Sequence, residues 1–209
     1  MKRLLLLLFF PSLCQAGEFV QKTEGVYEYT GVMIPSDVAA YKALFKGKPI
    51  EVVVDSGGGY LSVGIELADY TREFNHLVRL TAKQCYSAAA LWVAADPDFR
   101  YADKDSFLAF HLPYYAGGYA PTEADWMFAG YRIGACLDRS IGAKKADQLM
   151  FNMVKQRDKH GVNGYVVWSQ GEPERLGKWS WDPEGWAWDT DPELSRSKPP
   201  IKNGALIGF

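Results

Sequence analysis

The pattern of apolar and polar positions predicts alternating strands and helices along most of the chain. β-Branched residues dominate residues 50–54, which is typical of a strand buried in the centre of a sheet. Apolar residues then recur at helical spacing through residues 61–70. The predicted strands are 26–34, 50–54, 77–81 and 107–110, and the predicted helices are 36–45, 61–70, 87–95, 122–140 and 143–159. This alternation predicts an α/β fold with a mostly parallel sheet covered by helices.

The composition changes after residue 167. Five of the seven tryptophans lie in a segment that is otherwise rich in proline, glycine, serine and charged residues: Trp168, Trp179, Trp181, Trp186 and Trp188. We therefore expect one domain over residues 17–167 and a Trp-rich C-terminal extension over residues 168–209. This extension is either an arm packed over the domain or a partly ordered tail.

The first 16 residues have the organisation of a secretory signal peptide. Lys2 and Arg3 precede an apolar run, Leu4–Phe10, and a small-x-small ending follows at Cys14-Gln15-Ala16. The apolar run is too short to cross a bilayer as a helix. We expect cleavage after Ala16, a periplasmic or secreted bacterial protein, and no membrane span once the signal is removed.

Charge and cysteine content narrow the choice of partners. Without Lys2 and Arg3, 21 basic side chains stand against 25 acidic ones, and this balance argues against a nucleic-acid partner. Cys85 and Cys136 remain after cleavage, and in an oxidising compartment they could form a disulfide. The three histidines lack the spacing of metal ligands, so neither a metal nor a cofactor is predicted.

Three features could carry chemistry. Residues 57–59 are glycines directly after the buried strand, where backbone N–H groups can point into a site that binds an anion or oxyanion. Ser87 stands between a strand and an alanine-rich helix. It could cap this helix, or expose a hydroxyl that a neighbouring base activates. His111 ends an apolar strand, where it is either structural or a base.

The order and spacing of these features resemble the proteolytic subunit of the Clp protease, in the crotonase superfamily. The likeness is closest to the secreted Clp-like serine peptidases of bacteria. The matching stretches are Val52–Gly59, Gln84–Ala89 and Phe110–Pro113, and the resemblance covers roughly residues 50–115. Two departures are visible: Gly57 replaces a proline of the family, and Ala89 replaces the second cysteine of Cys-x-Ser-Ala-Cys.

The resemblance implies a role for each matching residue. Ser87 would be the nucleophile and His111 the general base. Backbone N–H groups of Gly59 and Ala88 would hold the oxyanion, and Gly58 would shape the loop. It also implies a spiral of ββα units and a peptide or protein substrate, and it is compatible with a homo-oligomer.

The third member of a catalytic triad has no clear match. The family's aspartate would align near Gln170, and the nearest carboxylates are Asp158 and Glu172. A Ser-His dyad and an inactive relative therefore both stay open. A non-catalytic protein of the same fold is the alternative, with its Trp-rich tail binding a partner or glycan. An acyl-CoA enzyme is disfavoured because coenzyme A is a cytoplasmic cofactor.

Overall fold

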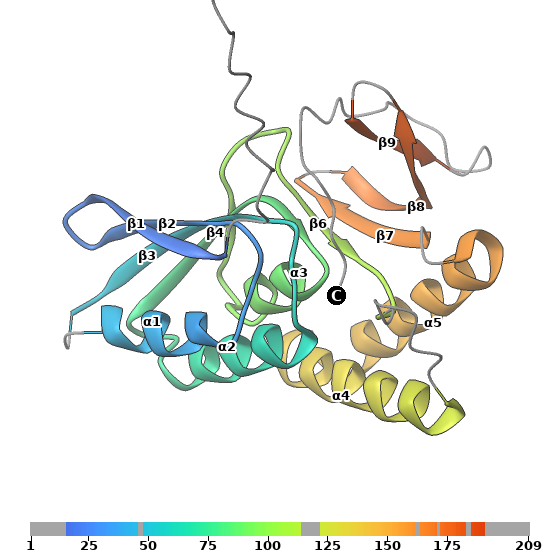
Figure 1. Cartoon of the computed structure of the whole chain (residues 1–209), viewed down its shortest axis with the longest axis horizontal. Helices are drawn as coiled ribbons and strands as arrows, with labels where there is room; N and C mark the ends of the chain where they lie inside the picture. Colours follow the sequence, from blue (N-terminus) through green and yellow to red (C-terminus); the bar gives the residue numbers. More distant parts are fainter. Residues whose placement is uncertain are drawn as a thin grey trace, which may run out of the picture.

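The computed structural model shows an α/β architecture in which helices gather on one side of a single mixed sheet (Figure 1). It describes residues 16–45, 48–113, 122–161, 164–170, 172–182 and 185–190, with side chains described only as far as residue 170. No described helix is both long enough and apolar enough to span a membrane.

Over these described ranges the sheet has nine strands, in the order β1-β2-β3-β4-β6-β7-β8-β9, with β5 paired to β4 beside this path. Its centre, from β2 to β6, is parallel, whereas the pairs β1–β2, β6–β7, β7–β8 and β8–β9 are antiparallel. The strands are β1 (Glu18–Thr23), β2 (Val26–Thr30), β3 (Ile50–Ser56), β4 (Val78–Tyr86), β5 (Arg100–Tyr101), β6 (Phe107–Phe110), β7 (Gly164–Ser169), β8 (Glu172–Asp182) and β9 (Gly185–Thr190).

All five predicted helices are present. They are α1 (Ser36–Leu44), α2 (Leu61–Glu73), α3 (Ala88–Val93), α4 (Glu123–Ile141) and α5 (Ala143–His160). The last two join at Gly142, where a φ of 81° suits glycine and interrupts the helix. At the start of α4, Thr122 and Asp125 form a reciprocal capping box, which satisfies backbone donors that the helix itself cannot.

The core lies between the sheet and the helices, and its largest side chains are aromatic. Trp92 of α3 is fully buried and meets the rings of Tyr29 and Tyr41 edge-on, at centroid distances of 5.3 and 5.1 Å. Its indole N–H donates to Thr71 Oγ1 at 2.9 Å. Thr71 Oγ1 also lies 2.9 Å from the Tyr41 hydroxyl. Polar atoms within this aromatic cluster are thus hydrogen-bonded, as burial requires.

Two sequence expectations differ from the structure in detail. The strand predicted at 77–81 continues through Tyr86, five residues beyond its predicted end. A register shift between Val54 and Ser56 on β3 accommodates the longer strand. The boundary drawn at residue 167 falls inside β7, and β8 and β9 extend the same sheet.

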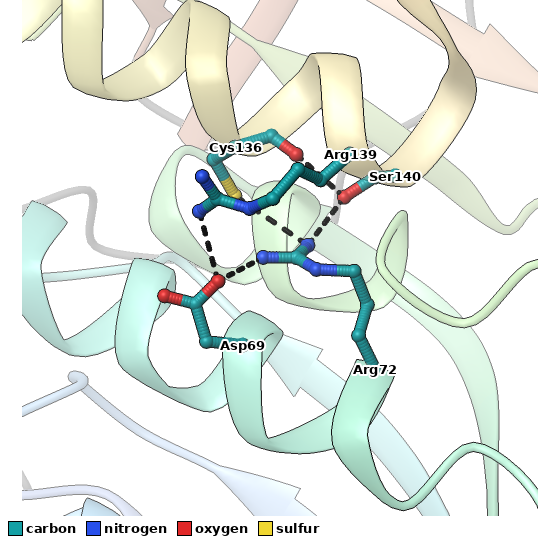
Figure 2. Close-up of polar contacts among 5 residues, drawn as sticks. All are labelled: Asp69, Arg72, Cys136, Arg139 and Ser140. Carbon is teal, nitrogen blue, oxygen red and sulfur yellow. Dashed lines mark hydrogen bonds and ion pairs between the residues drawn. The ribbon is translucent and has the colours of Figure 1, made fainter.

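The two described cysteines are separate free thiols, so the disulfide expectation is wrong. Cys85 Sγ donates to the Val54 carbonyl at 3.1 Å, whereas Cys136 lies between α4 and α2. Figure 2 shows Arg72 of α2 reaching Cys136 and donating to Ser140 Oγ at 2.6 Å. Asp69 bridges Arg72 and Arg139, which ties α2 to α4.

Candidate active site

The turn that holds Ser87 has an unusual backbone. Ser87 is the only described non-glycine residue with a positive φ, at φ 54° and ψ −123°. These angles mirror the first corner of a type II turn, a conformation that glycine normally fills. The Ser87 side chain makes no capping hydrogen bond, so the interpretation of Ser87 as a side-chain cap is wrong. Strain of this kind concentrates at functional sites.

The backbone of Ser87 is held on both sides. Its N–H donates to the Ala109 carbonyl of β6 at 2.8 Å, and its carbonyl accepts from the Leu91 N–H of α3 at 3.2 Å. These bonds fix the turn between the sheet and the helix, so the strained conformation is determined by its neighbours. The half-buried side chain takes no part in these bonds.

The glycine loop after β3 lies directly against this turn. A Cβ placed on Gly58 would come within 2.8 Å of Ser87 Cβ and 3.0 Å of the Ala88 nitrogen. The Gly58 N–H donates to Ser56 Oγ at 3.1 Å, and its carbonyl accepts from the Met33 N–H at 2.8 Å. The loop is therefore anchored at Gly58, and only a glycine permits this approach to the serine.

Two backbone donors in the glycine loop and the serine turn are not used by any described residue. The N–H groups of Gly59 and Ala88 form no hydrogen bond with another described residue. At Gly59 a Cβ would collide with the Met33 carbonyl oxygen at 2.3 Å, so this close pairing also requires glycine. Unpaired N–H groups next to a serine are the donors that an oxyanion hole needs.

His111 directly follows β6 and is only 9% exposed. Its Nδ1 lies 2.7 Å from the Leu112 carbonyl oxygen. Because a carbonyl oxygen only accepts, Nδ1 must carry the proton in this contact, and the neutral ring then has its lone pair on Nε2. The ring also packs against Tyr165 of β7, with centroids 4.6 Å apart. The pKa of His111 is lowered to about 4, mainly by burial; the nearby Arg157 guanidinium acts in the same direction, and the hydrogen bond to the Leu112 carbonyl opposes it.

The sheet brings Ser87 and His111 to the same edge. Strands β4 and β6 are parallel neighbours in which Tyr86 stands opposite Ala109, so both residues follow the carboxyl ends of adjacent strands. No hydrogen bond joins the Ser87 hydroxyl to His111 among the described side chains. Catalytic hydrogen bonds are often long before substrate binds, so this gap does not remove the pair as candidates.

The two candidate acids are placed differently. Asp158 is exposed on α5, and its carboxylate forms no hydrogen bond within the described part of the chain. Glu172 begins β8, where its backbone pairs with Ser169, but its side chain lies outside the described residues. The described acceptor at His111 Nδ1 is instead the Leu112 carbonyl.

Two residues near His111 were not identified from the sequence. Arg157 of α5 donates to the Pro113 carbonyl at 3.1 Å, and its guanidinium stacks 3.6 Å from the Trp126 ring centroid. Tyr165 supports the imidazole from β7. Neither belongs to a motif: β7 pairs with β6, and α5 packs against β7, so both residues come near His111 through tertiary contacts that local sequence does not reveal.

A separate surface hollow of about 790 Å³ lies beyond the far end of α3. Its lining includes Asp96, Phe99, Lys145 and Trp168 but none of the candidate catalytic residues. The Asp96 carboxylate is already used, since it accepts from the Leu80 and Asp98 N–H groups. Because its lining contains none of the candidate catalytic residues, this hollow is not part of the serine site.

No protein-family model matches the chain, and no curated protein matches it.

Proposed function

We propose that this protein is an exported serine hydrolase that cleaves peptide bonds, with Ser87 as nucleophile and His111 as general base. The observation that carries the proposal is the strained backbone of Ser87, which packs against a glycine loop with unused N–H donors and follows the strand next to the one that ends before the buried His111. Backbone strain lowers stability, and it is retained at functional sites where it orients a reacting group.

The chemistry follows from these positions. Ser87 Oγ attacks the scissile carbonyl carbon while His111 Nε2 takes the hydroxyl proton. The former carbonyl oxygen becomes an oxyanion and accepts from the N–H groups of Gly59 and Ala88. His111 then gives the proton to the leaving amine, and water releases the acyl group by the reverse sequence.

A Ser-His dyad fits the described contacts best. The Leu112 carbonyl holds Nδ1–H at 2.7 Å and thereby fixes the imidazole tautomer, a task that an aspartate performs in a triad. Asp158 and Glu172 remain the candidate acids if a triad forms. The finer fold assignment, a Clp-like spiral of ββα units, belongs to the same proposal. So does export, which rests on the apolar run after Lys2 and Arg3.

Labelling with a fluorophosphonate probe tests the nucleophile. The probe should attach to Ser87 in the wild-type protein, as shown by peptide mass spectrometry, and Ser87→Ala should abolish labelling. Ser62→Ala is the matched control, because Ser62 is an exposed serine three residues after Gly59 and should not affect labelling. His111→Ala should be nearly as damaging as Ser87→Ala, since nucleophile and base act as one unit.

A binding protein of the same fold is the second candidate. The register of β8 and β9 places Trp179 opposite Trp188 and Trp181 opposite Trp186. Aromatic residues concentrated in this way can bind sugars or anchor a partner. Trp168, in contrast, packs against Phe110 at a centroid distance of 4.9 Å. Wild-type protein that never labels between about pH 6 and 9, where His111 with its pKa of about 4 is neutral and able to accept a proton, would favour this second function.

A further inference from the structure

The hollow beyond the far end of α3 is built by three segments that are distant in the sequence. The turn after α3 supplies one wall, the junction between α4 and α5 supplies a second, and the end of β7 supplies a third. Its volume of about 790 Å³ lies within the range of pockets that bind small molecules. Because the hollow is separate from the serine site, an occupant of it would be a second ligand of the protein.

Most of the described lining is apolar, and part of it is aromatic. Phe99 and Trp168 each contribute a ring that is only partly buried. Phe99 is held edge-on against Tyr101 at a centroid distance of 5.3 Å, and Trp168 packs against Phe110. The remaining apolar lining consists of Ala94, Pro97 and Ile141. Walls of this kind suit an aromatic ring, which packs offset or edge-on against other rings.

Two of the three polar residues in the described lining are already paired within the protein. The buried Asp96 carboxylate accepts from two backbone N–H groups, at 2.7 and 2.9 Å, and lies 3.6 Å from the Arg79 guanidinium. Ser140 Oγ donates to a carbonyl of its own helix at 2.8 Å and accepts from Arg72 at 2.6 Å (Figure 2). Neither residue therefore offers an unpaired group to a ligand.

The third polar residue of this lining is Lys145. It is exposed in the first turn of α5, and its ammonium group forms no hydrogen bond or ion pair with a described residue. The charge that the hollow offers to a ligand is thus a single cation beside apolar walls. A carboxylate is a complementary group, because it accepts charge-assisted hydrogen bonds from an ammonium group.

We propose that this hollow binds a small aromatic carboxylic acid. The ring of the acid lies against Phe99 and Trp168, and its carboxylate accepts from the Lys145 ammonium group. A cationic ligand would be repelled by Lys145, and an uncharged one would leave the lysine without a partner. The proposal does not rest on the hydrolase, because neither Ser87 nor His111 lines the hollow.

Isothermal titration calorimetry with a matched acid and amide tests the role of charge. The probes are 1-naphthaleneacetate and 1-naphthaleneacetamide, which share the same ring system and differ in charge. The wild-type protein should bind the acid about three- to fivefold more tightly than the amide, the scale expected of an exposed ion pair. Ser87→Ala should bind both probes as the wild type does.

Lys145→Met removes the cation but keeps an unbranched side chain. The preference for the acid should disappear in this variant, while the affinity for the amide stays unchanged. Lys144→Met is the matched control, because Lys144 is the exposed neighbour in the same helical turn but does not line the hollow. It should keep the wild-type preference. Phe99→Ala should weaken both probes at least about threefold, and thermal melts show that each variant is folded.

Amide NMR spectra locate the bound acid. Its addition should shift signals from residues 94–99 and 140–145 rather than those around Ser87. The proposal is overturned if the wild type does not bind the acid up to about 5 mM, or if the amide binds as tightly as the acid. Equal loss of the preference in the Lys144 and Lys145 variants would also overturn it, as would shifts confined to the surroundings of Ser87.

Discussion

Ser87 shows how one residue type can support two interpretations until its backbone is known. A serine before an alanine-rich helix fits a side-chain cap, yet its side chain makes no capping bond and its φ is 54°. The strained backbone conformation of Ser87, and not its hydroxyl, is therefore what lowers the stability of the fold at this position. This distinction leads to a prediction that separates strain from chemistry.

Ser87→Gly should stabilise the protein while removing the nucleophile. Glycine adopts a positive φ without the steric cost that a side chain brings, so we expect the free energy of unfolding to rise by about 1 kcal/mol. Ser87→Ala keeps the strain and should leave stability nearly unchanged. Urea denaturation measures both variants, and probe labelling should be lost in each. Glycine and alanine variants of equal stability would show that the strain is absent.

The buried His111 should make stability depend on pH. Its folded-state pKa of about 4 lies below the ordinary value of about 6.5. The unfolded chain therefore binds more protons between these values, and the free energy of unfolding falls as pH falls through the window, by about 3 kcal/mol. His111→Gln removes the titrating group, so the difference between the wild-type and variant stability curves isolates this contribution. A difference that stays constant from pH 7 to about pH 4 would contradict the lowered pKa.

At the scale of elements, the important contact is that between the loop after β3 and the turn after β4. The two strands are parallel neighbours, and both of these segments leave the sheet at the same edge. Gly58 is the point of closest approach, because its missing side chain leaves room for Ser87 and Ala88.

Gly58→Ala should damage both stability and the site. The added methyl group would lie 2.7 Å from the Tyr86 carbonyl oxygen, and the φ of 89° disfavours any side chain. We expect a loss of about 2–4 kcal/mol in the free energy of unfolding, together with weaker probe labelling. Gly130→Ala is the control, since its methyl group meets nothing within 4 Å and should slightly stabilise α4. Denaturant titration of both variants distinguishes a local clash from a general intolerance of substitution.

At the scale of the whole molecule, the two described cysteines belong to different layers. Cys85 is a buried residue of β4 in the sheet, whereas Cys136 is on α4 and contacts Arg72 of α2. Alkylation of the denatured, unreduced protein followed by peptide mapping should find both as free thiols. A peptide pair linked through Cys85 and Cys136 would contradict this arrangement.

Export is also a property of the whole molecule, and it remains a prediction from the N-terminal pattern alone. Protein isolated from its native host should begin near Gly17 by intact mass spectrometry. Cytosolic protein that retains Met1 would exclude the exported hydrolase.

The local sequence determined most of the elements and the order of the candidate site. Helical spacing predicted α2 and the α4–α5 pair, and the β-branched run predicted β3. These predictions succeeded because hydrophobic periodicity, and the glycines and prolines that interrupt it, act within a few residues of one another. The glycine loop, Ser87 and His111 were likewise visible as residues, since strand ends and glycines have clear local signals.

Tertiary structure decided how those pieces meet. The approach of Gly58 to Ser87, the burial that lowers the pKa of His111 and the support from Tyr165 all join residues that are far apart along the chain. The continuation of β4 to Tyr86 depends on pairing with β3 and β6, and the separation of Cys85 from Cys136 depends on how the layers stack. Local preference carries no information about such contacts, because their free energy comes from packing between elements rather than from any one of them.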